Sequence, residues 1–236
     1  MKRLVLPLIL LAAPTQAATF TPPMGCTAYL TVQSRGCAVS QFYTCEGDAK
    51  GEQWRADFGA NGPSFLAKVD HDAQWLESYD FYEGTKELLT PMPRDPASFS
   101  DLLALGLDTF DFKLSKDNGE HTIVRGFDKL TGESTTIDGV TLKQTEYEYT
   151  QTDDKGTILV HSKGHEYISE EWRIFFSNHS DSKLEDGTEY LYDMPPVKFI
   201  TPGKPGFAST LPLFECDGQM SSLGLPHSVA KSLGGS

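Results

Sequence analysis

The segment from Thr122 to Phe176 constrains the fold most, because strand-forming runs alternate in it with turn-forming residues. β-Branched and aromatic residues favour strands, whereas Gly beside Asp, Asn or Ser favours tight turns. The segment therefore predicts a series of antiparallel strands joined by hairpin turns. The strand-like runs are 122–127, 140–150, 157–162 and 165–176, and the turns are Asp138-Gly139, Asp153-Asp-Lys-Gly156 and Ser162-Lys-Gly164.

The residues on either side of this segment predict more of the same sheet. Residues 74–82 alternate with a period of two, so that Trp75, Tyr79 and Phe81 share one face. The whole pattern predicts a mainly β protein, built as a curved antiparallel sheet or open barrel with one packed helix. Further strands are expected at 29–33, 37–45, 53–58, 64–69, 85–89 and 109–114, and edge strands at 197–200 and 211–214, where proline is tolerated.

One helix is expected, from Pro96 to Leu105. Asp95 is a suitable N-cap residue, Pro96 suits the first helical position, and Gly106 suits the C-terminal end. An apolar stripe would lay this helix on the sheet; it consists of Phe99, Leu102, Leu103 and Leu105.

The first seventeen residues have the pattern of a secretory signal peptide. Lys2 and Arg3 precede a short apolar run, and small residues then lead to Ala17. We therefore expect a signal peptide at 1–17, one domain at 18–220 and a flexible, glycine-rich tail at 221–236. No later apolar run has the length of a transmembrane segment. The expected location is the periplasm or the extracellular space.

The chain is acidic, with a formal net charge of −13 over 236 residues. Such a surface repels nucleic acid and anionic lipid headgroups at long range, so we expect no nucleic-acid partner.

Four cysteines in an exported chain predict two disulfides. They are Cys26, Cys37, Cys45 and Cys216, and three pairings are open. If 37–45 is one strand, its ends lie about 27 Å apart, too far for a Cys37–Cys45 bond. The residues around Cys45 and Cys216 are similar, as those of neighbouring strand ends can be, which favours Cys45–Cys216 with Cys26–Cys37.

Catalytic motifs are absent or incomplete in this sequence. No Gly-x-Ser-x-Gly elbow, Rossmann glycine pattern or phosphate loop occurs, and we expect no catalytic residues of these classes and no cofactor. A hairpin at Ser162-Lys-Gly164 would bring His161 and His165 face to face as a weak candidate metal site. The preferred interpretation is that these two histidines are solvent-exposed at a turn and bind no metal.

Aromatic residues on the predicted strands are the remaining indication of function. Most aromatic residues on a sheet serve its core. Alternatively, a concave face lined by them would bind an apolar ligand, with the helix as a partial plug. The candidate ligand-binding residues are Trp54, Trp75, Tyr79, Phe81, Tyr147, Tyr149 and Trp172.

The order of elements between Gln53 and Phe176 resembles that of periplasmic lipoprotein carriers, with a hairpin ending in 74–81, a turn at Glu83-Gly84, a helix and further strands. That resemblance implies an open, curved barrel that takes up acyl chains. The chain is also similar to exported bacterial proteins of unknown function in the pattern of Thr31-Val-Gln33, Cys37, Tyr43, Cys45, Glu46-Gly-Asp48 and Trp54-Arg55, which implies no activity.

Three hypotheses follow, and the first is favoured. The protein is a non-enzymatic exported protein that binds a lipid, another amphiphile or a cell-envelope protein. It is alternatively a hydrolase of envelope polymer that uses cleft carboxylates such as Glu146, Glu148 and Glu171. The third hypothesis is a structural envelope protein.

Overall fold

The computed structural model describes residues 18–216, so the expected signal peptide and tail lie outside the described residues. The elements are β1 (Cys26–Ser34), β2 (Ala38–Cys45), β3 (Gln53–Gly59), β4 (Gly62–Val69), β5 (Trp75–Asp80), β6 (Thr85–Leu89), α1 (Phe99–Leu105), β7 (Leu107–Lys116), β8 (His121–Ile137), β9 (Val140–Asp153), β10 (Ile158–Ser169), β11 (Ile174–Leu184), β12 (Glu189–Asp193) and β13 (Pro196–Ile200).

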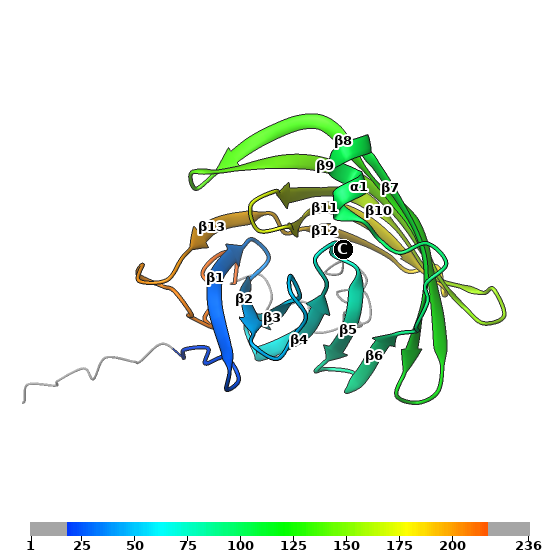
Figure 1. Ribbon diagram of the computed structural model, residues 1–236, viewed down its shortest axis with the longest axis horizontal. Helices are drawn as coiled ribbons and strands as arrows, with labels where there is room; N and C mark the ends of the chain where they lie inside the picture. The colour runs from blue at the N-terminus through cyan, green and yellow to red at the C-terminus, as the bar shows by residue number, and fades with distance from the viewer. Residues whose placement is uncertain (1–17, 217–236) are drawn as a thin grey trace, which may run out of the picture.

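The thirteen strands form one antiparallel sheet that curves around an interior (Figure 1). Each strand from β1 to β11 pairs with the next strand along the chain, and β13 returns to pair with β1. The sheet is not closed, because β12 and β13 are its two edges. The mainly β, curved antiparallel sheet predicted from the sequence is thereby confirmed, together with a single short helix among the described residues.

The two edge strands are consecutive in the chain, which forces the sheet to curl. β12 ends at Asp193 and β13 begins at Pro196, so only Met194 and Pro195 lie between opposite edges. The Met194 amide donates a hydrogen bond to the Asn178 carbonyl on β11, at 2.9 Å. The Arg35 amide, which directly follows β1, donates to the Pro195 carbonyl at 3.0 Å. This two-residue link therefore holds β11 and β1 close together.

The curl brings the first strands against the last ones in an apolar core. Phe42 of β2 and Phe176 of β11 lie 6.0 Å apart between ring centroids, edge to face. Leu142 joins the same core from β9. The Asp138-Gly139 turn before β9 has positive φ at both residues, as a two-residue hairpin of this kind requires. The Asp138 carboxylate accepts the Phe199 amide of β13 at 2.9 Å, so this hairpin reaches across to the sheet edge.

The helix is shorter than predicted and has a different N-cap. Ser98 caps α1 by accepting the Asp101 amide at 3.1 Å, and Gly106 ends it with φ of 80° as expected. Asp95 instead pairs with Asp111 of β7 in an isolated bridge, which draws this residue away from the helix start. Phe99 and Leu102 are buried against the sheet.

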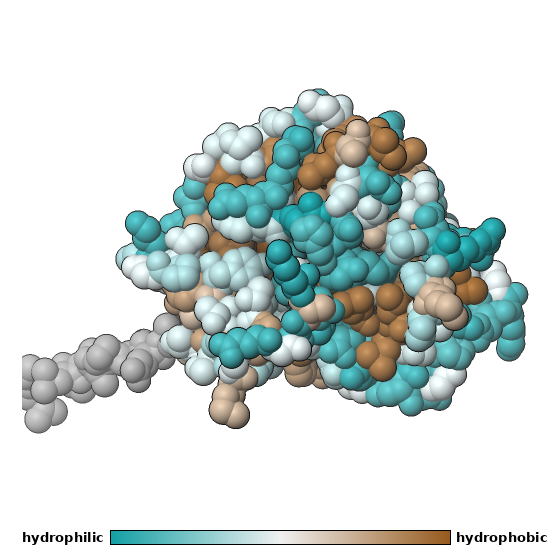
Figure 2. Space-filling view, in the orientation of Figure 1, coloured by the Kyte–Doolittle hydropathy of each residue, from teal (hydrophilic) through white to brown (hydrophobic). Residues whose placement is uncertain are grey.

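The predicted apolar stripe of the helix is wrong at its last residue. Leu105 is 75% exposed, whereas the buried residues of the seven-residue helix are Phe99 and Leu102. Figure 2 shows that apolar side chains gather on the surface near α1, within a face that is otherwise mostly polar.

The hairpin turn predicted at Ser162-Lys-Gly164 does not exist, because β10 runs without interruption from Ile158 to Ser169. Gly164 is needed for packing instead. A Cβ atom there would lie 2.3 Å from the His179 carbonyl oxygen on β11. The turn falls later, before β11, where Arg173 adopts a φ of 54°.

The disulfide pairing favoured from the sequence is wrong, although all four cysteines are bonded. The bonds are Cys26–Cys45 and Cys37–Cys216. Cys26 and Cys45 are direct partners on β1 and β2. Cys37 lies between these strands, and its amide donates to the Phe214 carbonyl at 2.8 Å, which places Cys216 within reach.

The segment 201–216 packs against β1 and β2 and buries their polar side chains. Gln33 and Gln41 are fully buried, and their amides donate to the carbonyls of Leu211 and Ser209. The Gln33 side-chain oxygen in turn accepts the Leu213 amide. Leu211 and Leu213 therefore bond to the Gln33 side chain, and Phe214 bonds to the backbone of Cys37 outside the strands, so the edge strand predicted at 211–214 does not form.

No helix in residues 18–216 combines the length and apolar character needed to cross a membrane.

The two disulfides differ in the length of chain that they close, which predicts unequal contributions to stability. The Cys37–Cys216 bond spans 179 residues and the Cys26–Cys45 bond spans 19. Loop-closure entropy assigns about 5 kcal/mol to the first and about 3 kcal/mol to the second. Urea unfolding of the two paired Cys→Ala variants should show the larger loss for Cys37 and Cys216. An equal or larger loss for Cys26 and Cys45 would contradict this ranking.

Candidate ligand-binding site

Three adjoining cavities lie on the inner face of the curved sheet, and Phe175 lines all of them. The first cavity has a volume of about 140 Å³, and the second and third have about 40 Å³ each. The third lies between the other two, since it shares Arg55 with the first and Trp75 with the second. The ring of Phe175 thus separates compartments of one interior.

The first cavity has an apolar wall and a polar wall. β1 to β5 face β11 and β12 across it. The apolar lining includes Val32, Phe42, Phe65, Phe176 and Met194, and the polar lining includes Ser40, Arg55, Asp57, Asp80, Asn178, Ser180 and Tyr192. A cavity of this size matches those that hold one benzene-sized molecule.

Arg55 carries buried donors that lack a hydrogen bond of good geometry, although its charge is paired with Asp57. Its side chain is 16% exposed, and its guanidinium lies 5.6 Å from the centre of the Phe65 ring. Nε lies 3.0 Å from Oδ2 of Asp57 as an ion pair. Neither Nε nor Nη2 has a hydrogen-bond partner with good geometry within residues 18–216. A buried guanidinium with unused N–H groups is a ready binding group for an anion.

The second cavity combines carboxyl groups with aromatic rings. Asp108 of β7 and Asp128 of β8 are direct cross-strand partners and both are buried. Tyr147 of β9 is the partner of Asp128 on the other side. The cavity lining is completed by Asp72, Ala73, Trp75, Ala97, Phe99, Phe110, Phe112, Val124, Tyr149, Gln151 and Phe175.

Burial holds both carboxyl groups of this pair toward their protonated forms. It raises the pKa of Asp108 to about 6, although the Ser98 amide, which donates to Oδ2 at 2.9 Å, opposes the rise. Burial also raises the pKa of Asp128 well above its ordinary value, and the charges of Glu166 and Asp108 add to that effect. Oδ1 of Asp128 has no hydrogen-bond partner in the described part of the chain.

The tyrosines beside this pair are held by a hydroxyl network. Tyr147 Oη lies 3.2 Å from Ser162 Oγ, and Ser182 Oγ donates to Ser162 at 2.8 Å. Burial raises the pKa of Tyr147, so its phenol stays neutral. The rings of Tyr147 and Tyr149 are stacked with centroids 6.0 Å apart.

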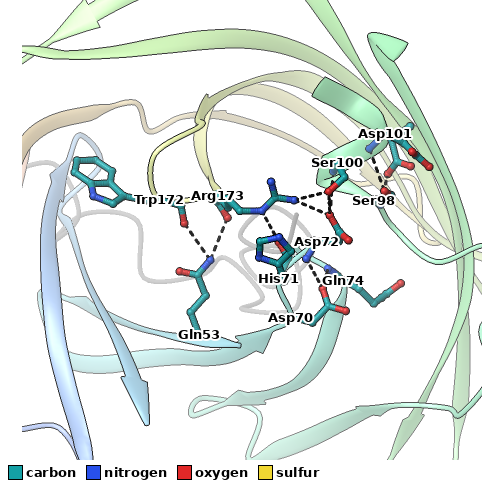
Figure 3. A network of polar contacts seen from close by, with 11 residues as sticks. Gln53, Asp70, His71, Asp72, Gln74, Ser98, Ser100, Asp101, Trp172 and Arg173 are labelled. Atoms are coloured by element: carbon teal, nitrogen blue, oxygen red, sulfur yellow. Dashed lines mark hydrogen bonds and ion pairs between the residues drawn. The ribbon is translucent and has the colours of Figure 1, made fainter. Parts of the chain in front are cut away.

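The turn between β10 and β11 ties the interior to α1 and to the turn before β5 (Figure 3). Arg173 Nη2 lies 2.6 Å from Asp72 Oδ1 and donates to Ser100 Oγ at 2.9 Å. The Gln53 amide donates to the Trp172 and Arg173 carbonyls, at 3.3 and 3.1 Å. This network fixes the end of the interior where Phe99 and Phe175 meet edge to face.

The structure brings three of the seven predicted aromatic residues to one cavity. Trp75, Tyr147 and Tyr149 line the second cavity. Trp172 packs instead in the core with Phe176 and Phe199. The role of these residues in binding stays a prediction.

Of the other three predicted aromatic residues, Trp54 lines the third cavity, and Tyr79 and Phe81 line none of the three. Trp54 stacks on Tyr43 and donates its indole N–H to Asp48 at 2.8 Å. Tyr79 lies under the Lys86 ammonium, and Phe81 is 52% exposed beyond the end of β5.

The two candidate metal-binding histidines do not meet. His161 and His165 lie four residues apart on one strand, because the hairpin predicted between them is absent. His161 Nε2 lies 2.7 Å from Glu148 Oε1, and His165 Nδ1 lies 3.2 Å from the Thr145 carbonyl. In residues 18–216 no group of three His, Cys, Asp or Glu side chains could hold a metal ion.

The acids named for a hydrolase are on the surface. Glu146 pairs with Lys129 at 2.6 Å, and its side chain is 42% exposed. Glu148 pairs with His161, and Glu171 is exposed. The sequence interpretation missed Arg55, Asp108 and Asp128, although Asp108 alternates in phase with the apolar Phe110 and Phe112. A carboxylate on the apolar face of a strand is the signal that would have indicated Asp108.

Comparison of the chain with protein-family models, with curated proteins and with solved structures finds no significant match.

The raised pKa of Asp108 predicts how stability changes with pH. Between pH 3.8 and about 6 the folded protein binds more protons at this group than the unfolded chain does. The free energy of unfolding therefore falls as the pH rises through this window, and the Asp108 carboxyl accounts for about 3 kcal/mol of that fall. The side chain of the Asp108→Asn variant cannot titrate, so the free energy of unfolding of this variant should decline less with rising pH. Urea unfolding at several pH values between 3.5 and 7 would check this.

Asp117→Asn is the matched control, since Asp117 is an exposed carboxyl in the turn after β7. Its pH profile should parallel that of the unsubstituted protein. A parallel profile for Asp108→Asn as well would show that the carboxyl titrates alike in both states.

Proposed function

We propose that this protein is an exported, non-enzymatic binding protein that holds a small amphiphilic anion in the first cavity. The proposal rests on the Arg55 donors that lack a well-formed hydrogen bond. Asp57 pairs with the charge of Arg55, but without a further bound acceptor these donors stay unsatisfied. The wall of Val32, Phe42 and Phe176 supports an apolar body for the same ligand.

The size of the cavity narrows the class of ligand. A volume of about 140 Å³ accommodates a ring or a short chain, not the acyl chains that a lipoprotein carrier would take up. A carboxylate on a benzene-sized body fits both the space and the Arg55 guanidinium.

Location in the periplasm or outside the cell is part of this proposal. Two disulfides are compatible with an oxidising compartment, where such bonds persist. A cell-envelope protein that presents an anionic apolar group is the alternative ligand of the same cavity.

Binding is favoured over hydrolysis by the surroundings of the carboxyl pair. Glycoside hydrolysis uses one ionised and one protonated carboxyl, with a sugar ring between them. Asp108 and Asp128 are instead direct cross-strand partners beside a cavity of only about 40 Å³.

Titration calorimetry with benzoate tests the proposal, with benzyl alcohol as the uncharged comparison. Benzoate should bind at least tenfold more tightly than benzyl alcohol, because a charge-assisted hydrogen bond contributes about 1.5–3 kcal/mol. Arg55→Gln should remove that preference while keeping weak binding of both.

Arg125→Gln is the matched control, since Arg125 is an exposed arginine on β8 that pairs with Asp111. It should bind benzoate as the unsubstituted protein does. Equal benzoate affinity in the Arg55→Gln variant, or no binding of benzoate at millimolar concentration, would overturn the proposal.

A further inference from the structure

We propose that the second cavity is a separate site for a primary ammonium group, held by Asp128 and Asp108 among aromatic rings. It is independent of the Arg55 site, and it takes a ligand of the opposite charge.

Asp128 provides the observation that points to a ligand. Its side chain is only 3% exposed, it lines the cavity, and its Oδ1 accepts no hydrogen bond from residues 18–216. A buried carboxyl oxygen without a donor is costly, so native proteins rarely keep one without a partner. An ammonium N–H is a donor that would fit this oxygen.

The charges around Asp128 favour a cation. Asp108 on β7, Tyr147 on β9 and Glu166 on β10 surround Asp128. The carboxyl charges of Asp108 and Glu166 both raise the pKa of Asp128. Asp72 lines the same cavity from the turn before β5 and is paired with Arg173. None of the described residues that line the cavity is Lys or Arg. A bound cation would supply the missing positive charge.

The aromatic rings favour an organic cation over a metal ion. Trp75, Phe110, Phe112, Tyr149 and Phe175 surround the cavity, and the faces of such rings attract ammonium groups. A hard metal ion needs six or more oxygen ligands instead, and the described residues offer no cluster of three metal-binding side chains.

Volume and hydrogen bonding together select a primary amine. About 40 Å³ holds a group of a few atoms, such as methylammonium. A quaternary ammonium ion is larger and has no N–H to donate to Asp128 Oδ1. The tail of a longer amine would extend past Phe175, which also lines the other two cavities.

Competition with protons gives the site a pH dependence. The pKa of Asp108 is about 6 and that of Asp128 is raised well above its ordinary value, so protons compete increasingly with a cation for the pair as the pH falls toward 5. Binding of an ammonium ion should therefore release protons into solution. Affinity should be higher at pH 8 than at pH 5, while the ammonium group itself stays charged throughout.

Titration calorimetry with methylammonium chloride tests the site, with tetramethylammonium chloride and sodium chloride at equal ionic strength. We expect saturable binding of methylammonium with proton release, at least tenfold tighter than that of tetramethylammonium or sodium. Asp128→Asn should weaken methylammonium binding about tenfold or more, and Asp117→Asn should leave it unchanged. Arg55→Gln should also leave it unchanged, which separates this site from the proposed anion site.

Three outcomes would overturn the inference. They are binding of methylammonium no tighter than that of sodium, equal binding of tetramethylammonium, and unchanged methylammonium affinity in the Asp128→Asn variant. If Asp128→Asn does not fold, Asp108→Asn replaces it, since an amide oxygen can still accept the Ser98 amide. Unchanged affinity in that variant would equally overturn the inference.

Discussion

The two-residue link between β12 and β13 is the constraint on which the rest of the structure depends. A meander of twelve strands could in principle stay open and flat. Here the strand at one edge continues through Met194 and Pro195 into the strand at the other edge, so the sheet must curl until its edges meet. The apolar core between β2 and β11 and the cavities on the inner face both follow from that curl. Prolines suit such edge positions, because they cannot donate to a strand ladder.

A curled sheet of this size encloses more space than its apolar side chains fill, and polar groups occupy part of the inner face. Arg55 and Asp57 on β3 face one cavity, and Asp108 and Asp128 on β7 and β8 face the other. One part of the interior therefore contains an arginine beside aspartates, the other contains carboxyl groups without Lys or Arg among its described residues, and Phe175 lines both. Groups buried in this way cost stability, which is a reason to connect them with function rather than with folding.

The local sequence patterns predicted the strands and turns of the fold well, but they could not predict the contacts between residues far apart in the sequence. Strand alternation, the Asp138-Gly139 turn and the helix end at Gly106 are set by neighbouring residues. The Ser162-Lys-Gly164 composition predicts a turn, whereas Gly164 is required for a close approach to β11 that depends on a strand pairing. The partner of Cys37 depends in the same way on the path of residues 201–216. At the site, the alternation of Asp108 with Phe110 and Phe112 indicates that its side chain lies on the apolar face of β7. Arg55 has no such signal, because β3 has mixed polarity on both faces.

The central claim is that the link joins the two edges of the sheet, and amide hydrogen exchange measured by NMR tests it most directly. The Arg35 and Met194 amides donate to Pro195 and Asn178 across the junction. We predict that these two amides exchange as slowly as those in the middle of β1 and β11. Exchange as fast as that of the amide of exposed Asn118, in the turn after β7, would contradict the account, because the sheet would then be open at this junction.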